Sequence, residues 1–193
     1  MSGLQSAMKG ICAILALVCV LGAASGAQAQ INLFGRDRAL VAAEDGDIAM
    51  IKRLVIERHR FDQKNFQGRT PLSIAAGRPD YEMVALLLEG GARHNDVDNV
   101  GNTPIFWAIE AGDYDVVELL LSAGADPDHQ NTQGITPLMT AARAGYDDIV
   151  QLLLDNGADV TVRDHTGKGP LSWARESRNR KVAQVLERAG AVD

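Results

Sequence analysis

Two short patterns of apolar and polar residues alternate along most of the chain. The first reads GRTPLSIAA at Gly68, GNTPIFWAI at Gly101, GITPLMTAA at Gly134 and GKGPLSWAR at Gly167, in three equal steps of 33 residues. The second is a leucine-rich run that closes on a small turn, as in LLLEGGA, LLLSAGAD and LLLDNGAD, and it keeps the same step. A regular period of roughly 20 to 50 residues indicates a protein built from repeated supersecondary units.

Residue types at fixed positions of each unit mark where two helices begin and end. Thr70, Thr103 and Thr136 precede the repeated proline, and a threonine hydroxyl can cap a helix whose first position tolerates proline. Glycine follows each leucine-rich run, where the chain must turn through a left-handed conformation that costs other residues energy. These glycines are Gly91, Gly124 and Gly157. The pattern therefore predicts a pair of short helices in each unit.

Small and charged residues at fixed unit positions predict how the units stack. One position is always alanine, which lets the first helices of neighbouring units approach closely. These residues are Ala42, Ala75, Ala108, Ala141 and Ala174. Two other positions are aliphatic except for Arg53 in the first unit and Glu187 in the last. Because a terminal repeat has one face in water, we expect these charges to mark the two ends of a five-unit stack.

The chain from Asp37 to Asp193 resembles the ankyrin repeat family, whose unit of about 33 residues carries the motif T-P-L-H-x-A. The resemblance implies an all-α solenoid of stacked helix-turn-helix units with projecting β-turn or hairpin fingers, and no intrinsic catalytic activity. The expected units are 37–69, 70–102, 103–135, 136–168 and 169–193. The first unit lacks T-P, and ESRNR replaces the glycine turn between the helices of the last. Both departures weaken the resemblance locally.

The first 29 residues have the composition of a cleaved secretory signal peptide. Lys9 leads into the uncharged stretch GICAILALVCVLG, which is too short for a membrane span of about 20 residues. Cleavage after Ala29 would leave a short linker, 30–36, before the repeats, and would remove both cysteines, Cys12 and Cys19. A thiol-free exported chain is typical of a bacterial periplasmic or secreted protein. Retention as an uncleaved anchor is the alternative.

Charge and motif content exclude several classes of function. The chain carries 19 Lys and Arg against 25 Asp and Glu, a net charge of −6, which argues against a nucleic-acid partner. Its histidines, His59, His94, His129 and His165, drift in position from unit to unit and do not converge as metal ligands would. No phosphate-binding loop, zinc-protease motif or nucleophile elbow occurs. We therefore expect no cofactor, no metal and no enzyme activity.

The surface that this architecture presents is a concave face made of finger tips and the exposed ends of first helices. Residues that vary between units at these places are the candidate protein-binding residues: Phe66, Arg69, Arg78, Asn99, Val100, Asn102, Glu110, Thr132, Gln133, Ile135, Arg143, His165 and Lys168. Phe66, Val100 and Ile135 are apolar where a finger tip is usually wet, which indicates either an interface or packing against neighbouring fingers. The basic residues among them form a stripe or are ordinary solvated charges.

Two neighbouring aromatic residues, Phe106 and Trp107, receive different interpretations from the repeat register. Trp107 shares a unit position with Thr140 and Trp173, and this large-small-large series is typical of a packed core. Phe106 occupies the position where the family has histidine, so the family's threonine-histidine hydrogen bond is absent and apolar packing is expected instead.

The sequence thus predicts an exported, monomeric, non-catalytic scaffold that binds an unidentified protein through its concave face and finger tips. A secreted effector, or an immunity protein that blocks a toxin, would share the same fold. An enzyme is the remaining alternative, and it would need a deep polar pocket that the sequence does not reveal.

Overall fold

The computed structural model describes residues 37–192, and the expected signal peptide and linker lie outside them. Ten helices of six to nine residues and no strands occur in this part of the chain. They are α2 (Arg38–Asp45), α3 (Ile48–Ile56), α4 (Pro71–Ala76), α5 (Tyr81–Glu89), α6 (Pro104–Ala111), α7 (Tyr114–Ser122), α8 (Pro137–Ala144), α9 (Asp147–Asp155), α10 (Pro170–Glu176) and α11 (Arg180–Arg188). The expectation of an all-helical fold is confirmed.

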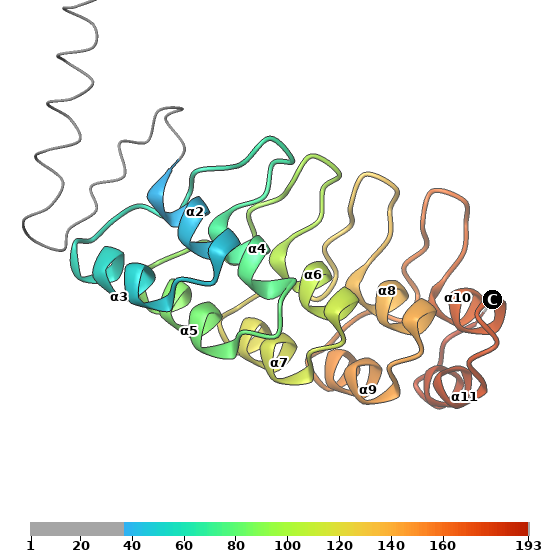
Figure 1. Cartoon of the computed structure of the whole chain (residues 1–193). Coiled ribbons are helices and arrows are strands. Elements are labelled where there is room, and N and C mark those ends of the chain that lie inside the picture. The colour runs from blue at the N-terminus through green and yellow to red at the C-terminus, as the bar shows by residue number, and fades with distance from the viewer. Residues whose placement is uncertain (1–36, 193) are drawn as a thin grey trace, which may run out of the picture. The chain divides into compact units, whose positions relative to one another are not determined.

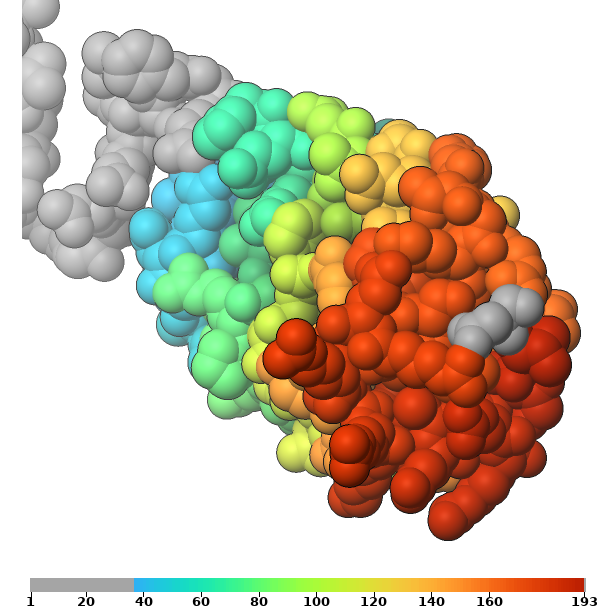
Figure 2. All heavy atoms as spheres, turned by 90° about the vertical axis from the view of Figure 1, so that its right-hand side faces the viewer, coloured from blue at the N-terminus to red at the C-terminus, as the bar shows by residue number. Residues whose placement is uncertain are grey.

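Within the repeat region the helices form two rows (Figure 1). The first helices of the pairs, α2, α4, α6, α8 and α10, pack side by side in one row, and the second helices α3, α5, α7, α9 and α11 form the other. Long loops that double back as fingers join each second helix to the next first helix and project on one side of the stack. Figure 2 shows the C-terminal end of this region, where α10 and α11 form the surface.

Capping explains where most first helices begin. The hydroxyl of Thr70 accepts a hydrogen bond from the backbone N–H of Ser73 at 3.2 Å, and Thr136 caps α8 in the same way at 3.2 Å. The prediction that the Thr103 hydroxyl caps α6 is wrong. The N–H of Phe106 donates instead to the carbonyl of Thr103 at 3.1 Å, and the buried Thr103 hydroxyl has no hydrogen-bond partner among the described residues.

The expected left-handed turns after the second helices are confirmed. Gly91, Gly124 and Gly157 have φ values of 84°, 96° and 87°. The turns between the two helices of a pair differ more. Most use a left-handed glycine, as at Gly112 with φ 70°, whereas Arg178 of the ESRNR segment takes that conformation itself with φ 58°.

The core runs along the interior between the two rows. The repeated alanines Ala42, Ala75, Ala108, Ala141 and Ala174 are all buried, which confirms the expected close approach of the first helices. Leucine, isoleucine and valine side chains of the second helices fill the space beneath them. Arg53 and Glu187, in contrast, are exposed on α3 and α11, as expected for solvated end units. Glu187 forms an ion pair with Arg175 at 2.7 Å.

Candidate protein-binding surface

Each finger is shaped by one Asn or Asp side chain near its tip. Its Oδ1 atom accepts hydrogen bonds from the backbone N–H groups two and four residues later, at 2.8 to 3.1 Å. The residues are Asn65, Asp98, Asn131 and Asp164. This local bonding closes the turn without help from other parts of the protein. The fingers therefore present their tip residues in fixed positions.

Neighbouring fingers are also bonded to one another. The backbone N–H of Asn99 donates to the carbonyl of Gln67 at 3.1 Å, that of Thr132 to the carbonyl of Val100 at 3.1 Å, and that of His165 to the carbonyl of Gln133 at 3.0 Å. The tips thus form one continuous row, and the predicted tip residues are brought together along it.

The predicted apolar tip residues divide into two groups. Phe66 is 83% exposed and Val100 is 51% exposed, so both lie on the surface of adjacent fingers. Of the two readings given for Ile135, packing holds, because it is only 9% exposed and packs within the core. Its backbone N–H and carbonyl are both bonded to Asn131, across the turn of the finger.

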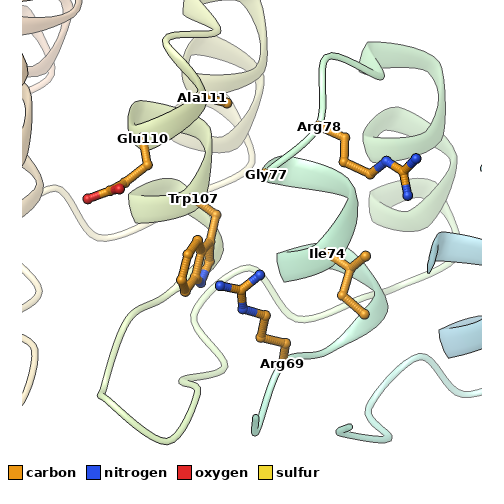
Figure 3. A pocket seen from close by; sticks show the side chains of 7 residues that line it. All are labelled: Arg69, Ile74, Gly77, Arg78, Trp107, Glu110 and Ala111. Carbon is orange, nitrogen blue, oxygen red and sulfur yellow. The ribbon is translucent and has the colours of Figure 1, made fainter.

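A hollow of about 420 Å³ lies between α4 and α6 on the side of the fingers (Figure 3). The residues that line it are Arg69, Ile74, Gly77, Arg78, Trp107, Glu110 and Ala111. The guanidinium carbon of Arg69 lies 3.2 Å from the centroid of the Trp107 ring, a cation–π contact. Burial lowers the pKa of Arg69, and the nearby Asp98 carboxylate partly offsets that decrease. We call this place the Trp107 hollow.

Trp107 is held at the wall of this hollow by a hydrogen bond. Its indole Nε1 donates to Oδ2 of Asp98 at 3.1 Å, while Oδ1 of the same carboxylate shapes the finger. The prediction that Trp107 packs is confirmed, because its half-buried ring contacts the core. The sequence did not predict that the ring also lines a hollow. Phe106 is fully internal, as expected, and meets the His129 ring edge-on.

A second hollow of about 270 Å³ lies between α6 and α8. It is lined by Val100, Asn102, Phe106, Glu110, Asn131, Thr132, Gln133, Ile135, Thr140 and Arg143. The guanidinium of Arg143 pairs with Glu110 at 2.8 Å, so these charges neutralise one another. The Thr140 hydroxyl donates to the carbonyl of Thr136 at 3.1 Å, so its proton is already used within α8.

The first helix of the last unit, α10, carries another tryptophan, Trp173, with cations beside it. Lys168 lies 5.3 Å and Arg143 lies 5.7 Å from the centroid of the Trp173 ring. Lys168 is paired with Glu176 at 2.6 Å. The predicted residues Arg69, Arg78, Asn102, Glu110, Arg143 and Lys168 therefore share one surface with the two tryptophans. We call it the inner face.

The described residues offer little support for other kinds of site. Within 37–192, no three His, Cys, Asp or Glu side chains are grouped so that they could hold a metal ion. Two of the histidines make structural contacts. His59 lies 2.9 Å from a carboxylate oxygen of Asp37, the cap of α2, and His129 lies 2.9 Å from the carbonyl of Gly101. No helix in the same range is long and apolar enough to cross a membrane.

Paired helices in two rows, with fingers on one side and hollows between the first helices, define an all-helical repeat solenoid. The family model for ankyrin repeats (3 copies) matches residues 39–131 and 123–192. The chain belongs to the ankyrin repeat family. Members of this family are generally non-catalytic protein-interaction domains. No curated protein matches the sequence.

Proposed function

We propose that this protein is an exported, non-catalytic scaffold that binds another protein through its inner face and finger tips. The observation that carries the proposal is the row of hollows along the first helices, lined by aromatic rings and cations beside exposed apolar tips. Tryptophan and arginine in partly desolvated hollows are the residue types that dominate binding energy at protein interfaces. The bonded fingers hold this surface in a fixed shape, which lowers the entropy cost of association.

Affinity capture with the tagged full chain, from the compartment in which it resides, tests the binding proposal. The inner-face variant combines Phe66→Ala, Val100→Ala and Arg143→Ala, and we expect it to lose the partner that the unchanged chain captures. A matched control replaces Ile56 and Tyr81, exposed side chains of the second helices, and we expect it to retain that partner. Equal capture by both variants, with unchanged helical spectra, would contradict the proposal.

Export is proposed from the sequence of residues 1–29, with the bacterial periplasm as the favoured compartment. N-terminal sequencing of the chain recovered from cells tests it directly. We expect a protein that begins at Gln30 and is released with the periplasmic fraction. Recovery of the intact N terminus in the cytoplasmic fraction would contradict export, and an intact chain in the membrane fraction would favour the uncleaved anchor.

A further inference from the structure

At the Trp107 hollow, one unit lacks a side chain that the other units carry. The unit position of Gly77 holds Glu44, Glu110, Arg143 and Glu176 elsewhere, all of which are long and charged. The backbone does not require glycine there, since Gly77 has φ −80°. A Cβ atom would meet nothing nearer than Trp107 Cβ at 3.6 Å, an ordinary contact. Gly77 therefore leaves open space at the floor of the hollow without any conformational need.

The cations around this space differ from those elsewhere on the inner face. Arg143 and Lys168 are each paired with a glutamate. Among residues 37–192, no carboxylate forms an ion pair with Arg69 or Arg78. Arg78 donates only to the backbone carbonyl of Glu44, and Glu110, on the rim, points away from both arginines toward Arg143. The Arg69 guanidinium at this hollow therefore has no ion-pair partner among the described residues, although the Asp98 carboxylate lies close enough to act on it electrostatically.

The stacking of Arg69 leaves its hydrogen-bonding edge available. Contact with the Trp107 ring uses the flat face of the guanidinium, whereas its N–H groups lie in the plane and match the two oxygens of a carboxylate. The Arg69 side chain donates no hydrogen bond to the described part of the chain. Ile74 and the indole add apolar walls suited to the methylene groups of an acidic side chain.

Resting on the proposed function, we infer that the Trp107 hollow anchors an Asp or Glu side chain of an acidic segment in the partner protein. Its carboxylate bonds to Arg69, beside the Trp107 ring, and occupies the space left by Gly77. Because the whole chain has a net charge of −6, the attraction is local to Arg69. Recognition consequently depends on a close, desolvated contact rather than on long-range steering.

Selection of random dodecapeptides displayed on phage, with the full chain as bait at physiological salt, tests the inference. We expect the recovered peptides to be enriched in Asp or Glu at one position. Replacing that residue by its amide in a synthetic peptide should weaken binding about tenfold or more, as measured by fluorescence anisotropy, because a charge-assisted pair is lost.

Four variants of the hollow sharpen the result. Gly77→Glu supplies an internal carboxylate and should abolish binding of the acidic peptides, and Gly77→Gln should weaken it by filling the space. Gly77→Ala keeps most of the space and should retain binding. Arg69→Lys keeps the charge but loses the planar donor edge, and it should weaken binding about tenfold.

The outcomes separate this inference from the proposed function. One outcome would overturn the carboxylate anchor alone. The selected peptides would show no acidic enrichment, would still compete with one another for the inner face, and would no longer bind the Phe66→Ala, Val100→Ala variant. Acidic peptides that bind Gly77→Glu as tightly as the unchanged chain would also overturn it. Peptides whose binding ignores every inner-face variant would overturn both proposals.

Discussion

The indole Nε1 of Trp173 donates a hydrogen bond to Oδ2 of Asp164 at 3.0 Å, and the same arrangement joins Trp107 to Asp98. In both units the other carboxylate oxygen shapes the finger. The units with Asn65 and Asn131 have no tryptophan nine residues later. Aspartate therefore occurs where its second oxygen can accept a hydrogen bond from an indole N–H, and asparagine occurs where no indole is present.

Replacing Asp164 by Asn tests this relationship. The amide can either accept the backbone N–H groups through Oδ1 or turn that oxygen toward Trp173, and each orientation leaves its NH₂ facing a donor. We expect a loss of about 1 to 3 kcal/mol in the free energy of unfolding, because a buried donor becomes unsatisfied. Urea unfolding in the Trp173→Phe background is the control. The same substitution should cost less there, and an equal cost in both backgrounds would contradict the account.

The dependence of stability on pH provides a second test of the same carboxylate. Burial raises the pKa of Asp164, but hydrogen bonds from Thr166, Lys168 and Trp173 together lower it below the ordinary value. The charged form is thus favoured by folding, and its contribution is complete above the unfolded pKa of about 3.9 and lost as the pH falls through the lower folded pKa.

The comparison that isolates this effect is between the unchanged chain and Asp164→Asn, unfolded in urea at a series of pH values. Their stability difference should stay constant from neutral pH to about pH 4 and shrink below it. A difference that grows as the pH falls, or that already shrinks near neutral pH, would show that the folded pKa is not lowered.

The fold was predictable because its signals are local. Prolines after Thr70 and Thr136, the alanine position and the left-handed glycines each act within a few residues, so the sequence alone indicates where helices begin, stack and end. The failed cap at Thr103 shows the limit of such signals. The N–H of Phe106 donates to the Thr103 carbonyl instead, although the T-P motif is the same as at Thr70 and Thr136.

The candidate site was less predictable, because it depends on contacts between units. Arg69 ends the first unit and Trp107 belongs to the third, so their contact appears only when the units are packed together. Ile135 was a candidate binding residue because its neighbours in sequence form a finger tip, yet its side chain packs within the core. The spacing of Asp98 and Trp107 is a signal that the sequence does contain, since Asp164 and Trp173 repeat it.

The unpaired hydroxyl of Thr103 leads to a prediction of opposite effects at equivalent positions. Thr103→Val removes a buried group that has no partner among the described residues, and it should raise the free energy of unfolding by about 1 kcal/mol. Thr136→Val removes a cap that accepts from the Met139 N–H, and it should lower that free energy by about 1 kcal/mol. Thermal and urea unfolding of the two variants would measure this, and losses of equal size in both would contradict it.

Two glycines should respond to alanine in opposite directions, for conformational reasons. Gly77 has φ −80° and room for a Cβ atom, so Gly77→Ala should stabilise the protein by about 0.4 to 1 kcal/mol through reduced freedom of the unfolded chain. Gly157 has φ 87° with no atom near its missing Cβ, so Gly157→Ala should cost about 1 kcal/mol from backbone strain alone. Urea unfolding would measure both. A destabilised Gly77→Ala variant would mean that the backbone requires glycine at this position. A stabilised variant would mean that stability does not explain the glycine, and that the open hollow beside Trp107 does.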